Sequence, residues 1–415
     1  MKMRRILSLM TLMIIGEFIF LLPFVITRIF RPTFLKVFEI TNLELGTSFS
    51  LYGLVAMGAY FVGGPLADRY SPRQLLPVSF FATALGGVVM AFIPSIYVLS
   101  MLYAFWGLTT ILLFWAAYVK AQRELGTDIG QGKSFGSIDA GRGLVAAILA
   151  SSTVFLLDAF LPVSADTASL EQMTDALSKI IFVVAGLTAS GAFLVWLFLP
   201  KEEFEGHNLP KISLVGVKEA LKRRSAWMQA LIVLCSYVGY KSTDDFSLYA
   251  SVVLGYNDVD AAHLASISFW LRPVAAILAG YLGDRFLHSN IIMGCFVLMA
   301  LGAFSISTGF FVDGLPIFIF MTIVTTSAAV YGLRGLYFAL FQESNIPLTF
   351  TGSVAGIVSV IGYTPDIFMG PMMGFTLDNN PGPAGHELFF TYVTAFAFLG
   401  FIATMIFKKT TRPRL

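Results

Sequence analysis

Charged residues are scarce in this sequence. Asp, Glu, Lys and Arg form 13% of its 415 residues, whereas apolar residues form 57%. A soluble domain is typically about 25% charged, so this composition excludes a water-soluble globular fold. We interpret the chain as an integral membrane protein with very little soluble mass. Its formal net charge is only +2, and we expect no nucleic-acid partner because such a protein offers no accessible surface for one.

Cysteines and catalytic motifs are also nearly absent. The two cysteines, Cys235 and Cys295, fall within long apolar runs, where they serve as small packing residues rather than as a disulfide or metal pair. The sequence contains no zinc-ligand spacing and no P-loop, GxSxG or HExxH pattern. We therefore expect no enzyme activity, no metal site and no cofactor.

Long apolar runs recur instead along the whole chain. A run of roughly 20 residues crosses a hydrocarbon core about 30 Å thick. The first run has no small-x-small cleavage site, which favours a membrane helix over a cleaved signal. We predict an all-α membrane protein with twelve transmembrane helices. These lie near 6–27, 46–67, 74–93, 96–119, 137–160, 178–199, 226–253, 262–283, 290–311, 315–338, 351–376 and 388–407.

The loop charges predict an orientation for these helices. With a cytoplasmic N-terminus, Lys and Arg concentrate in the inside segments, as the positive-inside rule requires. The outside segments then hold only Arg28, Arg31, Lys36 and Lys179. We expect a multi-pass protein of the bacterial inner membrane with both termini in the cytoplasm.

A repeated string divides the chain into two halves. The sequence reads GGPLADRY over Gly63–Tyr70 and GYLGDR over Gly280–Arg285, each time where a long apolar run ends. The longest polar connection separates predicted helices six and seven, so the two strings occupy matching positions in their halves. Parallel repeats of six helices are a known transporter design. We predict an N-terminal six-helix bundle over 1–200, a cytoplasmic linker over 201–224 and a C-terminal six-helix bundle over 225–415.

The chemistry of the repeated string suits a membrane helix end. Gly64 and Gly280 permit a helix to end or to approach a neighbour closely. Asp68 and Asp284 can cap the next helix or pair with a nearby arginine. The arginine that follows each aspartate then faces anionic lipid or a carboxylate.

The two strings resemble the signature loop of the major facilitator superfamily, G-x-L-a-D-R-x-G-R-K/R. The matching residues are Gly64, Leu66, Ala67, Asp68 and Arg69 in the first copy and Gly280, Leu282, Asp284 and Arg285 in the second. The first copy departs from the pattern at Ser71, Pro72 and Arg73, and the second continues with Phe286, Leu287 and His288. The resemblance implies a conformational latch between the halves. Its members are Gly64, Asp68, Arg69, Gly280, Asp284 and Arg285.

Two further phrases resemble a narrower group. FGSIDAGRGL, over Phe135–Leu144, and SVIGYTPDIF, over Ser359–Phe368, are similar to phrases of bacterial permeases grouped near sugar-phosphate and organic-anion transporters. The superfamily resemblance implies two six-helix bundles that alternate access to a site near the membrane midplane. No nucleotide-binding motif is present, so transport would draw its energy from an ion or substrate gradient.

Ionisable residues inside the predicted helices are the candidate site. Such a residue costs at least about 2.5–3.5 kcal/mol at the membrane centre, so it marks function or internal pairing. Glu17, Arg272 and Asp366 lie near the midplane, and Arg142 and Arg334 lie nearer the cytoplasmic ends of their helices. Predicted helices three, six, nine and twelve have no charged residue in their cores. The resemblance implies that these four are peripheral and that the others line a polar cavity.

Each charge has two interpretations. Arg272 binds an anionic substrate with its fork of donors, or it is neutralised by Asp366. Glu17 couples transport to protons, since desolvation favours a protonated carboxyl, or it is a hydrogen-bonded acid near Arg142 or Tyr52. Asp366 is a second candidate proton site. Arg142 and Arg334 are gate or substrate residues, or they are anchors that snorkel to the interface.

Neighbouring residues add detail to this candidate site. Asp139 and Arg142 are three apart and could satisfy one another. Lys241, Asp244 and Asp245 suggest an extracellular gate network. Tyr240 and Tyr363 belong to a set of aromatic residues beside charged or glycine-rich positions, and an aromatic wall with one or two fixed cations suits an organic anion. For any one of them, core packing is the alternative.

Helix eleven is unusually rich in glycine and proline. Pro365 removes a backbone hydrogen bond beside Asp366, and a membrane tolerates such a break only next to protein or water. We predict that this helix bends at the cavity.

Taken together, these features predict a monomeric secondary transporter that moves a small organic anion by alternating access. Proton-coupled symport and exchange against another anion both fit. A transporter of a neutral sugar or drug is one alternative, and its arginines would be structural. A membrane ligand sensor without transport is another, and lipid flipping is a third.

Overall fold

Helices make up the regular structure. The computed structural model describes residues 2–126, 131–200, 221–309, 316–344 and 351–411, and within these ranges no strand occurs. Among the described residues, eleven helical segments are long and apolar enough to cross a membrane. Each lies on one of the predicted runs, so the all-α membrane architecture is confirmed.

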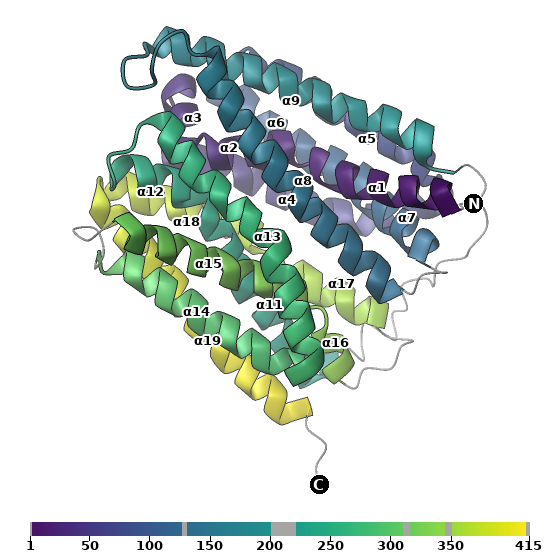
Figure 1. The fold of residues 1–415 in the computed structure, drawn as a ribbon. Coiled ribbons are helices and arrows are strands. Elements are labelled where there is room, and N and C mark those ends of the chain that lie inside the picture. Colours follow the sequence, from purple (N-terminus) through teal and green to yellow (C-terminus); the bar gives the residue numbers. More distant parts are fainter. Residues whose placement is uncertain (1, 127–130, 201–220, 310–315, 345–350, 412–415) are drawn as a thin grey trace. The chain divides into compact units, whose positions relative to one another are not determined.

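Figure 1 labels the helices of the first six predicted spans α1 to α9, in the order of the sequence. Two spans contain a π-helical turn, Leu21–Val25 and Leu108–Trp115, which no hydropathy pattern announces. A short helix, α3, lies in a connection that was predicted only as a loop. The elements are α1 (Lys2–Phe18), α2 (Ile26–Ile29), α3 (Arg31–Phe38), α4 (Asn42–Arg69), α5 (Pro72–Ala91), α6 (Ile96–Gly107), α7 (Ala116–Gly126), α8 (Gln131–Phe160) and α9 (Leu170–Phe198).

The second half contains two interrupted spans. The seventh predicted span consists of α11 (Arg224–Ser242) and α12 (Phe246–Val252), joined by a 3-10 turn over Thr243–Asp245. The eleventh consists of α17 (Thr351–Gly362) and α18 (Pro365–Asn379), so the helix is interrupted directly before Pro365. The bend at the cavity stays a prediction. The remaining elements are α13 (Asp258–Phe286), α14 (His288–Ser307), α15 (Pro316–Leu336), α16 (Leu340–Glu343) and α19 (Pro383–Thr411).

Contacts along the chain define two compact units. The first contains 1–209 and 244–273, and the second contains 210–243 and 274–415. Thus α12 and the first half of α13 pack with the N-terminal helices. The division into bundles at 1–200 and 225–415 stays a prediction, and most of the predicted linker lies outside the described residues.

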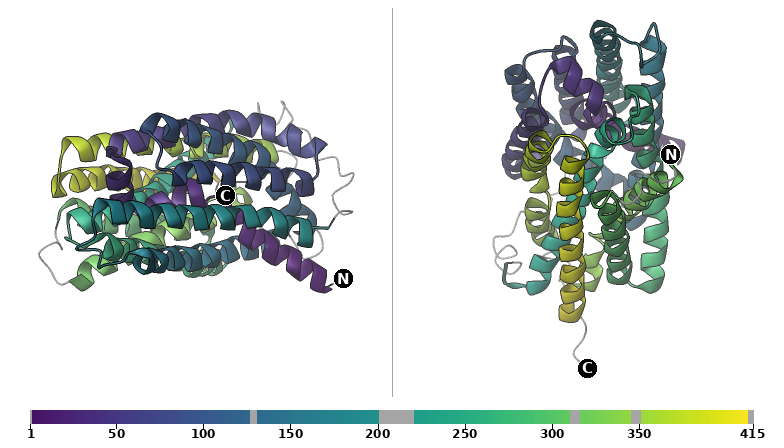
Figure 2. Two further views of the ribbon diagram at one scale, coloured as in Figure 1. Left: turned by 90° about the horizontal axis from the view of Figure 1, so that it is seen from above. Right: turned by 90° about the vertical axis from the view of Figure 1, so that its left-hand side faces the viewer.

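Each unit contains a matching pair of long helices that carry no central charge. In the first unit α5 packs along α9, and in the second α14 packs along α19. Figure 1 shows α5 and α9 side by side, and the right view of Figure 2 shows the yellow helix α19 running alongside green helices of its own unit. These are the third and sixth spans of each half, as expected for a repeat.

The two pairs also repeat one packing detail. In the first unit, the ring of Phe80 lies against Gly191, and in the second the ring of Phe296 lies against Gly400. Both rings are fully buried. Phe80 and Phe296 follow Gly64 and Gly280 at the same spacing in the sequence, so the repeat extends from the loop into the helix core.

Substitution of Gly191 provides a test of this packing. A Cβ atom at Gly191 would lie 2.6–2.9 Å from the ring atoms of Phe80, whereas one at Gly186, in the same helix, would meet no described atom within 4 Å. We expect Gly191→Ala to destabilise the protein by about 1–3 kcal/mol, the usual cost of overpacking. Gly186→Ala is the matched control and should not lower the melting temperature in detergent. Equal melting temperatures for the two variants would contradict the packing.

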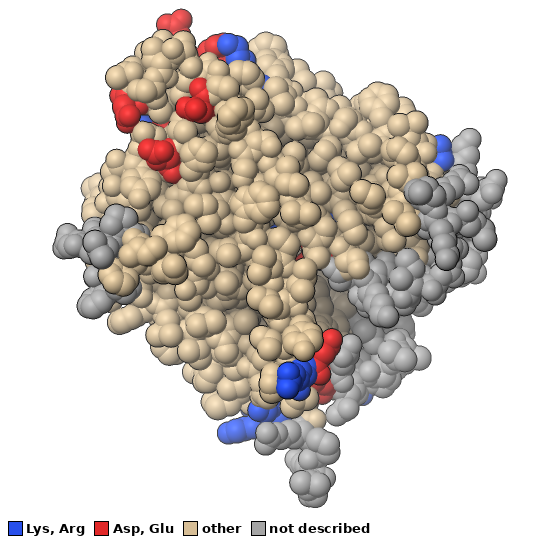
Figure 3. Space-filling view, viewed as in Figure 1, with Lys and Arg blue, Asp and Glu red and all other residues tan. Residues whose placement is uncertain are grey.

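The outer faces of the helices suit a lipid environment. In the first unit Leu85, Phe155 and Leu197 are largely exposed. On the face drawn in Figure 3, charged side chains of this unit gather beside the connection between α8 and α9, and the helix flanks are uncharged. Such an apolar surface requires a nonaqueous cover, which the bilayer provides.

Candidate functional site

The first group of buried charges lies within the first unit. We call it the arginine cluster, and it consists of Glu17 on α1, Asp139 and Arg142 on α8, and Arg272 on α13. Asp139 and Arg142 share one face of α8 because residues three apart are neighbours on a helix. The three helices thus bring two acids and two bases together.

Two glycines make room for the arginine cluster. A Cβ atom at Gly143 would lie 3.1 Å from Cγ of Arg272, and one at Gly16 would lie 2.8 Å from Cδ of Arg142. The glycines in these helices therefore admit long cationic side chains between closely packed backbones.

Glu17 is the shared counter-ion of the two arginines. Its carboxylate oxygens lie 3.1 and 3.2 Å from Nη1 of Arg272, and Oε2 lies 3.6 Å from Nη2 of Arg142. The side chains of Glu17, Arg142 and Arg272 are 6%, 12% and 7% exposed. An arginine stripped of water in this way is stable only beside an acid.

Asp139 contacts the same arginines from a more open position. Its Oδ1 lies 3.5 Å from Nη2 of Arg272 and 3.7 Å from Nη1 of Arg142, and its side chain is 44% exposed. The ring of Tyr118 also contacts the guanidinium of Arg142, 5.9 Å from centroid to Cζ, and its hydroxyl donates to the carbonyl of Leu12. Sequence reasoning missed Tyr118, although the glycine opposite it, Gly16, was a possible signal.

The second group lies within the second unit and is rich in tyrosine. We call it the tyrosine cluster; its members are Tyr237, Tyr240, Lys241, Arg334, Tyr337, Tyr363 and Asp366. On α11, the spacing of Tyr237, Tyr240 and Lys241 places all three on one face. The interruption between α17 and α18 falls between Gly362 and Pro365. Tyr363 and Asp366 lie at this interruption, beside that face of α11.

The acid of the tyrosine cluster lies beside a tyrosine and a lysine. The Tyr237 hydroxyl donates to the Asp366 carboxylate at 3.1 and 3.2 Å. Nζ of Lys241 lies 3.7 Å from Oδ1 of Asp366, and the lysine side chain is 3% exposed. Asp366 is therefore held by a neutral donor and a buried cation.

The rings of the cluster surround a second cation. Cζ of Arg334 lies 3.8 Å from the ring centroid of Tyr240 and 5.8 Å from that of Tyr237, within cation–π range. The hydroxyls of Tyr337 and Tyr363 lie 3.3 Å apart. The described cluster thus places aromatic faces beside two cations and one carboxylate.

A third group of charges lies elsewhere in the first unit. Arg28 on α2 pairs with Asp244, and the Arg28 guanidinium lies over the ring of Phe269. Nζ of Lys36 lies 2.7 Å from Asp258, which also accepts a hydrogen bond from Thr33. These contacts connect α2 and α3 to the 3-10 turn before α12 and to α13.

A cavity lies beside this third group. Its volume is about 590 Å³, and α3 and the α8–α9 and α12–α13 connections line it. Lys36, Asp166 and Asp258 are its charged lining residues.

The family of the chain follows from its sequence matches. Residues 6–370 match the family description Major Facilitator Superfamily. The chain belongs to the Major Facilitator Superfamily. Two similar proteins of Escherichia coli strain K12 are the inner membrane proteins YqcE, 25% identical over 370 residues, and YihN, 25% identical over 420 residues. The matches cover 86% and 98% of this chain and 84% and 96% of those proteins.

A solved structure supports the same fold. A bacterial homolog of the human lysosomal transporter Spinster, in an inward-facing and unoccupied conformation, aligns with a TM-score of 0.71 at 14% identity over 100% of both chains. This superfamily member is accordingly a multi-pass inner-membrane transporter and not an enzyme.

In the repeated superfamily loops, the glycine that begins the G-x-L-x-D-R string neither ends a helix nor approaches a neighbour closely. A Cβ atom at Gly64 or Gly280 would meet no described atom within 4 Å, and neither helix ends at its glycine. The expected close approach is therefore wrong for these two residues. Gly283 has a close neighbour instead, because its Cβ atom would lie 2.8 Å from the ring of His288.

Other residues make capping contacts at the helices that follow these loops. Ser71 caps α5 in a capping box with Gln74. At the start of α14, the carboxylate of Glu343 accepts a hydrogen bond from the Ser289 backbone. Asp284 instead lies 3.5 Å from Nε2 of His288.

The other latch residues have local contacts. The Arg69 guanidinium lies over the ring of Tyr70, and that of Arg285 lies over Phe286. The side chain of Asp68 lies outside the described residues. The latch function of the six loop residues remains a prediction.

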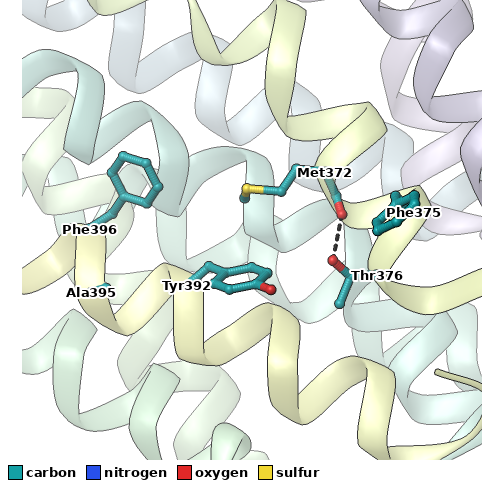
Figure 4. Close-up of a pocket in the computed structure, with 6 residues that line it drawn as sticks. All are labelled: Met372, Phe375, Thr376, Tyr392, Ala395 and Phe396. Atoms are coloured by element: carbon teal, nitrogen blue, oxygen red, sulfur yellow. Dashed lines mark hydrogen bonds between the residues drawn. The ribbon is translucent and has the colours of Figure 1, made fainter. Parts of the chain in front are cut away.

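The second unit also has an apolar groove between α18 and α19. Its volume is about 260 Å³, and none of its described lining residues is charged. Figure 4 shows Tyr392 and Phe396 on one helix and Met372 and Phe375 on the other. The groove has no fixed polar group to orient a substrate apart from Thr376 and the Tyr392 hydroxyl, and Thr376 donates to the carbonyl of Met372. We do not assign it to the transport site.

The structure also gives each predicted site residue its neighbours. Glu17 lies beside Arg142, as one interpretation expected, and the Tyr52 hydroxyl bonds to Thr110. Arg272 contacts Glu17 and Asp139, and Asp366 contacts Tyr237 and Lys241. The helix-seven trio is divided, since Lys241 pairs in the second unit and Asp244 in the first.

Proposed function

We propose that the protein transports a small organic anion by alternating access, with Arg142 and Arg272 as the contacts for its anionic group. The observation that carries this proposal is that two buried arginines both contact an acid whose side chain is partly exposed. Each guanidinium contacts the buried Glu17 and the more open Asp139. A guanidinium fork suits carboxylate and phosphate.

Energetics support a functional role for these charges. Replacing a buried ion pair by apolar residues is often neutral or stabilising, so stability alone does not explain four charged groups in membrane spans. Each arginine costs at least about 2.5–3.5 kcal/mol at the membrane centre. Binding of a charged substrate provides a reason to retain them.

The tyrosine cluster supplies a second set of substrate contacts in this proposal. Arg334 would bind a further anionic or polar group, and Tyr240 and Tyr363 would contact an apolar or sugar body. The same rings favour one other candidate, a neutral sugar. Its transport would leave the arginine cluster with a structural role.

Coupling is assigned to Glu17 and Asp366 in this proposal, because each is an acid beside a buried base. Proton symport and anion exchange are two modes of the same cycle. The repeated loops, with Gly64, Asp68, Arg69, Gly280, Asp284 and Arg285, are proposed as the latch on the cytoplasmic side, where both termini would lie. We propose a monomer as the transporting unit.

A binding screen tests the proposed substrate class. The purified protein would be heated with matched pairs of compounds, such as gluconate with glucose and glycerol 3-phosphate with glycerol. We expect the acids to raise the melting temperature and their neutral partners to have no effect. A shift caused by the neutral compounds alone would favour the sugar transporter. Ionic strength is held constant with sodium chloride, because surface charges respond to salt.

Substitution of the two acids distinguishes the coupling modes. In proteoliposomes, we expect Glu17→Gln and Asp366→Asn each to reduce proton-driven accumulation of the anion by about tenfold or more, the scale of a typical coupling energy. Exchange of internal for external anion should persist in both. Asp175→Asn, at an exposed acid of α9, is the control. Wild-type uptake that ignores a proton gradient but requires internal anion would identify an exchanger and remove the proton role of both acids.

A further inference from the structure

We propose that Asp139 is an internal substitute for the anionic group of the substrate. Its carboxylate occupies the open side of the Arg142–Arg272 pair until a substrate carboxylate or phosphate displaces it. This inference rests on the proposed function, and it identifies the residue that sets the affinity and charge selectivity of the arginine cluster.

The first argument is that Glu17 and Asp139 contact different guanidinium nitrogens of each arginine. Glu17 contacts Nη2 of Arg142 and Nη1 of Arg272. Asp139 contacts the other terminal nitrogen of each, Nη1 of Arg142 and Nη2 of Arg272. Each arginine therefore offers one end to the buried acid and the other end to Asp139. An anion that replaces Asp139 would find two converging donors and leave the contacts of Glu17 intact.

The second argument is the difference between the two acids. Glu17 lies within hydrogen-bond distance of Arg272, at 3.1 Å, and is 6% exposed. Asp139 lies at 3.5 and 3.7 Å and is 44% exposed. Distances beyond about 3.2 Å indicate weak contacts, and ion pairs that water reaches contribute little. Glu17 lies 3.6 Å from Arg142, so the two acids differ in their distance from Arg272 and in exposure. Asp139 is the acid that a solute can reach.

The third argument is geometric. Asp139 places one oxygen, Oδ1, between the two arginines, whereas a carboxylate or phosphate of a free solute can present one oxygen to each. Bidentate contacts are stronger than single ones. A side-chain rotation suffices to withdraw Asp139, because alternative staggered rotamers need no backbone shift. A neutral solute gains no such contact and cannot compete.

The variant Asp139→Asn removes the competing charge and keeps the shape of the side chain. Binding of gluconate, citrate, glycerol 3-phosphate and glucose 6-phosphate would be measured by calorimetry on the purified full-length protein. We expect the anions that bind the wild type to bind this variant about two- to fivefold more tightly, the factor for losing one water-exposed ion pair. In flux assays KM should fall and kcat should fall with it, because Asp139 no longer helps to release the anion.

Two controls separate this effect from a general change in charge or folding. Asp139→Glu retains the competing carboxylate and should bind anions like the wild type. Asp175→Asn removes an exposed acid that pairs with Lys179 in the same unit, and it should also leave anion binding unchanged. Asp139→Ser repeats the test if the asparagine variant unfolds.

The outcomes are distinct. Tighter anion binding by Asp139→Asn but not by Asp139→Glu supports the inference. Unchanged or weaker binding by Asp139→Asn and Asp139→Ser, with the wild type still binding anions, overturns it and leaves the proposed function intact. Binding of no anion by the wild type or the variants overturns the proposed function and this inference with it.

Discussion

Transport by Arg272→Ala is expected to fall at least about 100-fold below that of the wild type. Hydrogen bonds to charged groups contribute about 1.5–3 kcal/mol each, and the substitution removes a fork that contacts both acids of the arginine cluster. Uptake of the anion into proteoliposomes, normalised to the amount of folded protein, is the measurement. We expect Arg272→Ala to lower kcat/KM and also to weaken the equilibrium binding of the anion.

Loss of folding must be separated from loss of binding in this experiment. Arg272→Ala removes the closer of the two partners of Glu17, and breaking a buried pair in this way costs about 3–5 kcal/mol. The double variant Glu17→Gln/Arg272→Gln removes both charges and should recover much of the melting temperature without recovering transport. Arg272→Lys keeps the charge without the fork and should be intermediate. Full transport by the double variant would show that Arg272 is structural.

Arg28→Met is expected to be the most destabilising substitution outside the arginine cluster. The side chains of Arg28 and Asp244 are 2% and 5% exposed. The variant therefore removes a guanidinium from beside a buried carboxylate. We expect a loss of about 3–5 kcal/mol of stability, measured as a lower melting temperature in detergent.

Two further variants isolate the ion pair. Arg28→Met/Asp244→Leu replaces both charges by apolar groups and should recover most of the stability. Lys179→Met breaks a pair whose side chains are both about half exposed and should cost less than about 1 kcal/mol. A melting temperature for Arg28→Met equal to that of Lys179→Met would contradict the buried pairing.

The architecture was predictable from the sequence because membrane thickness sets the length of each apolar run. The repeated G-x-L-x-D-R string then predicted two halves. The π-helical turns and the 3-10 turn at Thr243–Asp245 were not predictable, since these local changes of helix geometry depend on packing against neighbours. The break before Pro365 was predictable because proline removes a backbone hydrogen bond.

The candidate site was predictable as a set of residues but not as a set of pairs. Glu17, Arg142 and Arg272 stood out because charges in apolar spans are costly. Pairing of Arg272 with Asp366 was one of two interpretations and stays a prediction; the contacts of Arg272 with Glu17 and Asp139 were not predicted. Which acid meets which base depends on the rotation and depth of each helix, and a hydropathy pattern contains neither quantity.

The central claim is that the buried arginines bind a transported anion. Uptake of a labelled acid and of its neutral partner, gluconate beside glucose and glycerol 3-phosphate beside glycerol, into proteoliposomes containing the wild-type protein tests this claim most directly. We predict saturable uptake of at least one acid, inhibited by other small organic anions and absent for the neutral partner. Saturable uptake of a neutral partner, unaffected by any of the acids, would contradict the claim.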